Sequence, residues 1–274
     1  MTDSPIGFPP QVRQATLASL LVDLRGRADT ARTEAVTGRL ADIAAGRNGG
    51  VAEVLDVEKR LADLETYRDS IALARSRAET TQASLASIND GALELAGQAE
   101  IALQSRATVA LEPMSDEARD LLGGVVSALN VTLAGRALFA GDDSDGAAVT
   151  DAQTLIANAA TALGGATSVI DAQAALDDYF ADATAAPVYL GGTGSASSAE
   201  IAPGERVDHH VRADRPEIRA ILRDVATLAI AFDPDIASPL SDTARQQLAA
   251  EATLSLRSEL ARLNITRGDL GSAE

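Results

Sequence analysis

The sequence contains no cysteine and no tryptophan. Without cysteine, the chain has no disulfide bond, no thiolate metal site and no cysteine nucleophile. Aromatic residues make up only 3% of the 274 residues, so we do not expect an aromatic-lined ligand pocket of the usual kind. Histidine occurs twice, at the adjacent positions His209 and His210. These absences remove much of the common catalytic and cofactor-binding chemistry.

Basic residues are also scarce. The chain has 23 Lys and Arg against 40 Asp and Glu, which gives a net charge of −17, and Lys59 is its only lysine. A nucleic-acid backbone and an anionic membrane surface would both be repelled by this charge. We therefore expect no nucleic-acid partner.

No segment has the pattern of a membrane span or a cleavable signal peptide. The first ten residues lack both a basic start and an apolar run. Residues 121–135 are too short to cross a bilayer, and residues 152–170 carry polar side chains such as Gln153 and Asn158. We expect no membrane insertion and no cleavable signal peptide.

Helical periodicity is abundant in the first part of the chain. Residues 11–45 and 51–107 each carry apolar residues three and four positions apart, and residues 47–50 suit a turn between two helices. The second segment, with no proline, predicts a coiled-coil or bundle helix of about 80 Å at 1.5 Å per residue, and therefore a rod. The first stripe is Leu17, Leu21, Leu24, Ala28, Ala31 and Ala35; the second is Val57, Leu61, Leu64, Ile71, Ala78, Leu85, Ile88, Ala92, Leu95, Ala99 and Ala102.

Three further helices are expected towards the C-terminus. Ser115 has the features of an N-cap for a helix that ends near Phe139. Pro216 suits the first position of the next helix, and Ser241 suits the N-cap of the last. The last helix carries an apolar stripe at Leu248, Ala252, Leu256, Leu260 and Leu263.

The middle of the chain differs in charge and in pattern. Residues 137–205 contain no Lys or Arg but ten acids. Two short helices are expected in residues 151–181, followed by a small β meander with Gly/Ser and Pro-Gly turns. The fold class predicted is mainly α: an elongated antiparallel bundle of long coiled-coil-like helices from both chain ends, with a small acidic α+β insert. The predicted domain limits are 1–142, 143–212 and 213–274.

Three short motifs resemble binding sites, but each lacks a required feature. His209 and His210 are neighbours on an expected strand, so they point to opposite faces and do not share a metal ion. Residues 142–146 resemble the start of a calcium loop, yet Gln153 stands where a bidentate Glu is needed. Residues 191–195 are rich in glycine but lack the lysine of a phosphate loop. We predict no catalytic, cofactor-binding or metal-ligating residue, no cofactor and no enzymatic activity.

One segment resembles a known family. Residues 129–141, with the sequence LNVTLAGRALFAG, are similar to the "N…GRYLFAG" segment of the hook-associated protein 3 (hook–filament junction) family within the flagellin superfamily. The tyrosine of that motif is replaced by Ala137, and the β insert is reduced. Members of the family extend beyond this C-terminus with a helix that pairs with the N-terminal one. Further similarity lies in residues 37–42, 61–67, 189–191, 203–207 and 211–214.

The resemblance implies a structural protein of the bacterial flagellum. Such a protein is exported by the flagellar type III apparatus and is extracellular. Its partners are neighbouring copies in a ring, the other hook–filament junction protein, flagellin and an export chaperone. The helical ends would lie inside the tube, with residues 143–205 facing outward. Flagellin itself, or a cytoplasmic coiled-coil adaptor or signalling module, is the alternative.

Overall fold

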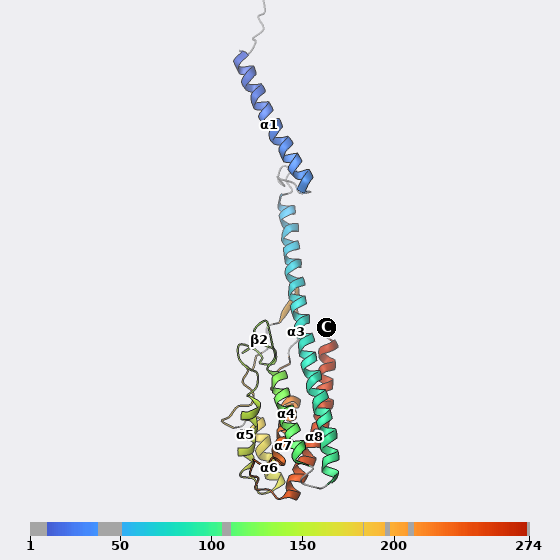
Figure 1. Ribbon diagram of the computed structural model, residues 1–274. Coiled ribbons are helices and arrows are strands. Elements are labelled where there is room, and N and C mark those ends of the chain that lie inside the picture. Colours follow the sequence, from blue (N-terminus) through green and yellow to red (C-terminus); the bar gives the residue numbers. More distant parts are fainter. Residues whose placement is uncertain are drawn as a thin grey trace, which may run out of the picture. The chain divides into compact units, whose positions relative to one another are not determined.

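The computed structural model describes residues 10–37, 51–105, 111–182, 184–194, 198–207 and 211–272 (Figure 1). The chain divides into two units, residues 1–66 and 67–274. Seven helices and two small antiparallel sheets lie among the described residues, which confirms the predicted mainly-α fold with a small β insert. None of these helices is long and apolar enough to cross a membrane. The predicted turn at residues 47–50 lies outside the described residues.

The first unit contains α1 (Pro10–Thr37) and the beginning of α3 (Val51–Ser105). Both were expected, although residues 38–45 and 106–107 of the predicted helices lie outside the described residues. Neither helix contains a proline after its first residue, and the 3/4 spacing of apolar residues suits both. None of the side chains described in residues 18–37 and 54–66 is buried.

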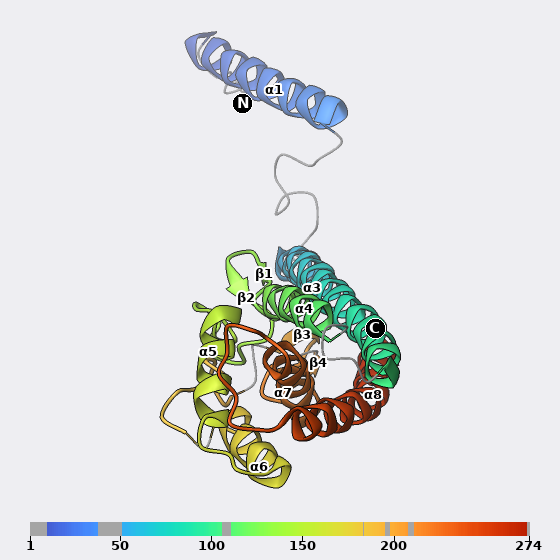
Figure 2. The ribbon, with the colours of Figure 1, turned by 60° about the horizontal axis from the view of Figure 1, so that its bottom comes forward.

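The second unit is built around α7 (Pro216–Ala231), which Figure 2 shows in the middle of the other helices. Four helices pack against α7: α4 (Glu112–Leu129), α5 (Ala152–Leu163), α6 (Val169–Phe180) and α8 (Asp242–Ser272). The stripe predicted on α7 is buried, but 12 of its 16 residues are buried, so it is a core helix rather than a surface helix. Pro216 begins α7 as expected.

Within the second unit α3 and α8 run antiparallel, side by side (Figures 1 and 2). Gln82 donates a hydrogen bond to the carbonyl of Arg267 (2.9 Å), and further along Asn264 donates to Asn89 (3.1 Å). The stripe predicted on α8 is buried along its length, and the backbone N–H of Ala244 donates to the Ser241 hydroxyl, which confirms Ser241 as the N-cap.

The predicted role of Ser115 is wrong. Helix α4 begins at Glu112, so Ser115 lies inside it and is buried. Its hydroxyl donates to the carbonyl of Leu228 (2.9 Å) and accepts a hydrogen bond from the backbone N–H of Phe232 (3.2 Å). Ser115 therefore ties α4 to the end of α7, a long-range contact that a local capping rule does not detect.

The predicted end of the same helix near Phe139 is also wrong. Helix α4 ends at Leu129, and β1 (Thr132–Leu133) pairs with β2 (Arg136–Ala137) in an antiparallel hairpin. Ala134 and Gly135 connect the strands with positive φ angles of 52° and 76°, as a tight hairpin turn with the strand's own twist requires. The apolar pattern of this segment comes from a buried loop, not from a helix.

The insert contains the two expected short helices, α5 and α6. Their N-caps are Asp151 and Ser168, whose side chains accept hydrogen bonds from the backbone N–H of the third residue of each helix. The expected β structure is present as a hairpin of β3 (Ala199–Ala202) and β4 (Glu205–Val207), and Tyr189 pairs with Val149 through a single bridge. Helices α5 and α6 share one core with α7; the limits predicted at residues 142 and 212 stay a prediction.

Candidate assembly surfaces

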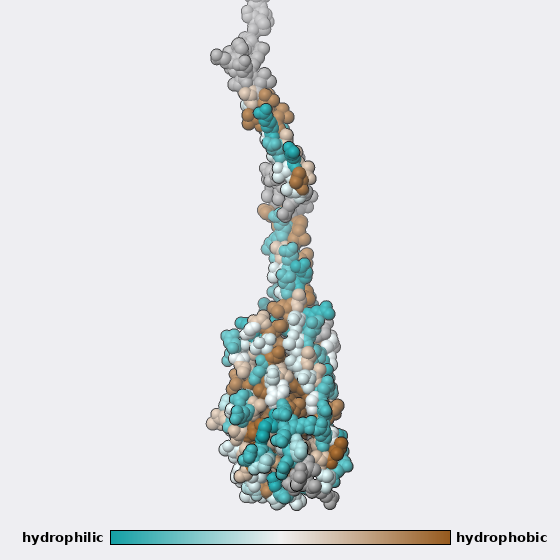
Figure 3. Space-filling view, viewed as in Figure 1, coloured by the Kyte–Doolittle hydropathy of each residue, from teal (hydrophilic) through white to brown (hydrophobic). Residues whose placement is uncertain are grey.

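The apolar stripes predicted on α1 and on the start of α3, called seams below, are exposed in the first unit. Leu21 and Leu24 of α1 are 57% and 60% exposed, and Leu61 and Leu64 of α3 are 56% and 62% exposed. Figure 3 shows these apolar (brown) regions on the surface of α1 and of the start of α3. Burying a leucine side chain contributes about 1.5–3 kcal/mol, and an isolated helix is marginal in water. These seams are therefore surfaces that gain stability when another helix covers them.

The same α3 pattern is satisfied inside the second unit. From Ala78 to Ala99 the residues of the predicted stripe are buried against α4 and the antiparallel α8. Gly91 lies where an added Cβ would come within 2.6 Å of the Leu121 side chain on α4, so α3 and α4 pack closely there. The stripe of α3 therefore has two parts. From Ala78 to Ala99 it belongs to the core of the second unit, whereas at Leu61 and Leu64 it is exposed.

Three segments meet in the second unit, and each of them includes residues that carry the family resemblance. Phe139 is fully buried, and its carbonyl accepts a hydrogen bond from the backbone N–H of Ala213 (2.9 Å). The carbonyl of Ala140 accepts from Gly192 (2.9 Å), and the Asp142 carboxylate accepts from Gly194 (2.8 Å). Residues 129–141, 189–194 and 211–214 therefore form one connected loop structure, which sequence spacing alone did not reveal.

Glycine is required in this loop structure. A Cβ on Gly192 would lie 2.0 Å from the Asp142 carboxylate, whereas a Cβ on the exposed Gly146 would meet nothing within 4 Å. We expect Gly192→Ala to destabilise the protein by about 1–3 kcal/mol through overpacking. Gly146→Ala is the matched control and should change stability by less than about 0.5 kcal/mol. Urea unfolding of both variants tests this, and equal stabilities would contradict it.

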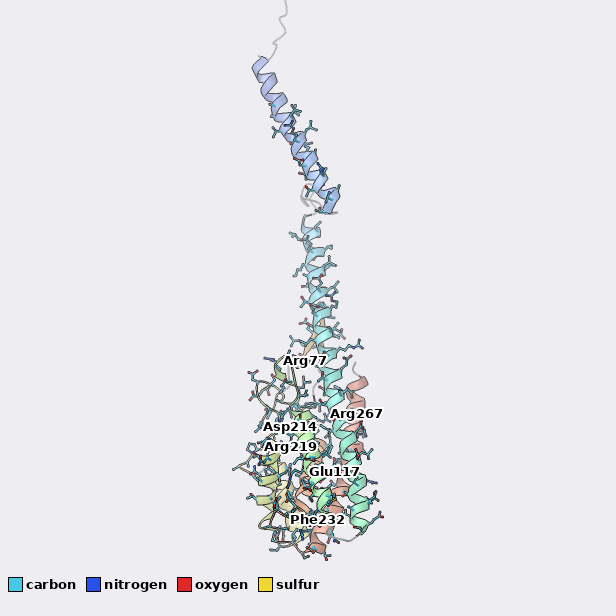
Figure 4. The ribbon with its side chains drawn as sticks, viewed as in Figure 1. Arg77, Glu117, Asp214, Arg219, Phe232 and Arg267 are labelled. Atoms are coloured by element: carbon cyan, nitrogen blue, oxygen red, sulfur yellow. The ribbon has the colours of Figure 1, made fainter. Side chains whose placement is uncertain are left out.

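Arg219 ties the insert to α7. Its guanidinium forms an ion pair with Asp182 (2.6 Å), donates to the carbonyl of Phe180 (3.0 Å) and donates to the carbonyl of Asp214 (3.0 Å). Figure 4 shows Arg219 and Asp214 close together at the start of α7. These bonds use most of the guanidinium's donors, so the residue is occupied by the chain's own structure.

Asp224 is the most perturbed acid among the described residues. It lies on α7, 2% exposed, beside a cavity of about 240 Å³, and pairs with Arg223 at 2.8 Å. Burial raises the pKa of Asp224 to about 6, and Arg223 and Ser255 oppose part of this rise. Asp177 of α6 and Glu251 and Glu259 of α8 are the other charged groups near this pair. The cavity's charges are thus engaged mainly with one another.

This raised pKa predicts a pH-dependent stability. Between the unfolded value near 3.8 and the folded value near 6, the folded state holds a proton that the unfolded state has released, so stability falls as pH rises. Asp224→Asn removes this titration. We expect its unfolding free energy relative to wild type to rise by up to about 3 kcal/mol from pH 4 to pH 7. The exposed Asp178→Asn is the control; a pH-independent difference for Asp224→Asn would contradict the assignment.

The residues weighed as binding motifs do not form a site in the described structure. No group of three or more His, Asp or Glu there is arranged to hold a metal ion, and His209 and His210 lie outside the described residues. Asp142 accepts a backbone hydrogen bond, as given above, while Asp143 and Asp145 are exposed. Gly191, Gly192 and Gly194 lie close to residues 140–142, where an added Cβ on any of them would clash.

Two comparisons with known proteins give no match. No protein-family model matches the chain, and no curated protein matches it.

Two solved structures share the fold. The structure of Bacillus cereus FlgL aligns with a TM-score of 0.57 at 14% identity and covers 81% of this chain and 89% of that one. A putative flagellar hook-associated protein from Vibrio parahaemolyticus aligns with a TM-score of 0.54 at 14% identity and covers 83% of this chain and 94% of that one. At this identity the likeness shows a common fold along most of the chain.

Proposed function

We propose that this protein is a structural component of the bacterial flagellum that joins the hook to the filament. The observation that carries the proposal is the fold shared, over more than four fifths of the chain, with FlgL and with a putative flagellar hook-associated protein. Three of the segments that resemble the hook-associated protein 3 family by sequence, residues 129–141, 189–191 and 211–214, belong to the loop structure around Phe139. Sequence and fold thus support the same proposal through different observations.

The uncovered seams supply the physical basis for assembly. Helices that leave leucines about 60% exposed gain free energy when a neighbouring helix covers them. We propose neighbouring copies in a ring, the second hook–filament junction protein and flagellin as the partners. We further propose a non-enzymatic role, an extracellular location on the flagellum, and export through the flagellar type III apparatus with its chaperone.

Locating the protein on flagella tests the proposal. An epitope tag inserted after the exposed Asp145 keeps clear of both helices of the first unit. Immunogold labelling of isolated flagella should place gold at a single position between hook and filament. Label along the whole filament would support flagellin instead. Label confined to the cytoplasm would support the coiled-coil adaptor and would overturn the proposal.

A further inference from the structure

The two helices of the first unit each carry an apolar seam with heptad spacing, flanked by charged residues. In α1 the seam runs through Leu21, Leu24, Ala28, Ala31 and Ala35, alternating between the a and d positions of a heptad. Each of these side chains is exposed. In a coiled coil, residues at a and d are buried by a facing helix, and the neighbouring e and g positions select which helix that is.

The flanking charges of α1 are mainly basic. Arg25 and Arg32 occupy e positions, and Arg27 and Glu34 occupy g positions. Two α1 helices packed antiparallel would bring Arg25 of one against Arg32 of the other, because e positions face e positions in that arrangement. The same arrangement brings Arg27 of one helix against Glu34 of the other, so attraction at the g positions offsets repulsion at the e positions, and α1 gains no net charge pairing from a second α1.

At the start of α3 the e positions carry acidic residues, where those of α1 carry arginine. Its seam contains Val57, Leu61 and Leu64, with Glu58 and Glu65 at the e positions. Two such segments packed antiparallel would place Glu58 against Glu65. Charge therefore disfavours pairing between two such α3 segments, whereas their glutamates complement the arginines at the e positions of α1.

One antiparallel register satisfies the charges of both helices. When Ala31 faces Leu61, three successive layers set a small residue against a large one: Ala35 on Val57, Ala31 on Leu61, and Ala28 on Leu64. The next two layers set Leu24 on Arg68 and Leu21 on Ile71. Each flanking pair then joins opposite charges: Arg32 with Glu58, Arg25 with Glu65, and Glu34 with Arg60. A shift of one heptad towards the N-terminus of α1 would set Arg27 against Arg60, so charge favours the first register.

We propose that α1 folds back on the start of α3 in the same chain, as an antiparallel helical hairpin. The 13 residues between Thr37 and Val51 span up to about 45 Å when extended, whereas packed helices lie 8–10 Å apart. An attached partner acts at an effective concentration in the millimolar range, above that of a separate copy.

The hairpin would protect the assembly surface before assembly. In this role, which rests on the proposed function, α1 covers the leucines of α3 until a neighbouring subunit displaces it. The hairpin itself follows from the seams and charges alone. It is therefore tested on the purified full-length chain, without flagella, so that its failure leaves the proposed function standing.

The absence of native cysteine allows a direct cross-linking test. In the double variant Ala31→Cys/Leu61→Cys, mild oxidation of dilute protein should give an intrachain disulfide in most molecules, detected by non-reducing gel and peptide mass spectrometry. The control Thr33→Cys/Lys59→Cys places both thiols at f positions, away from the seams, and should cross-link at least about tenfold less. Interchain dimers as the main product, or equal cross-linking of the two variants, would overturn the hairpin.

Charge reversal provides a second readout. In the Ala31→Cys/Leu61→Cys background, Arg32→Glu should slow intrachain disulfide formation about threefold, because Glu58 then faces a like charge. Adding Glu58→Arg restores an attractive pair and should restore the rate. If the second reversal slows the reaction further, Arg32 and Glu58 do not face each other and the register is refuted.

Discussion

Cells in which Leu61 is replaced by Asp are expected to lose attached filaments to the level of a deletion strain. Leu61 lies in the uncovered seam of α3, 56% exposed, and contributes to no core in the described structure. A carboxylate in that seam would have to be desolvated when a partner helix covers it, at a cost of several kcal/mol. Counting attached filaments in complemented cells measures the effect.

The neighbouring residue supplies the matched control. Ala62→Asp adds the same charge one residue away, outside the seam, and should leave filament attachment near the wild-type level. In both variants the second unit should unfold within about 0.5 kcal/mol of wild type, because neither side chain belongs to its core. Wild-type filament counts with Leu61→Asp would show that this seam plays no part in assembly.

Phe139→Ala is expected to destabilise the second unit by about 3–5 kcal/mol. The side chain is fully buried where residues 129–141, 189–194 and 211–214 meet, and its removal leaves a cavity among segments held by backbone hydrogen bonds. A loss of this size is a large fraction of the 5–15 kcal/mol that stabilises a typical protein. The midpoint of urea unfolding reports the loss.

Leu138→Ala gives the comparison for this prediction. Leu138 is only half-buried, so its truncation should cost clearly less than that of Phe139. If both variants unfold at the same urea concentration, Phe139 does not anchor the three segments.

Helices were the most predictable part of the fold. The 3/4 spacing on α3 and α8, and the Pro and Ser signals before α7 and α8, each depend on residues close in sequence, and they identified those helices correctly. Residues 130–139 were misread as helix because their apolar residues are buried by distant segments. Positive φ at Ala134, not a glycine, begins the turn there.

Contacts between distant residues were not predictable in this way. The hydroxyl of Ser115 bonds to α7, and the Asn130 side chain exchanges two hydrogen bonds with the backbone of Val149. Ser115 carries the local signal of a helix cap, which tertiary structure overrides. The spacing of apolar residues predicted the stripes on α1 and α3. It could not predict which part of the α3 stripe is buried, because that depends on which residues of α3 lie beside α8.

Imaging flagella from cells that lack this gene tests the central claim most directly. If the protein joins hook to filament, cells should build hooks but carry no filaments, release flagellin into the medium, and regain filaments when the wild-type gene is restored. Normal filaments attached to normal hooks in the deletion strain would contradict the proposed function.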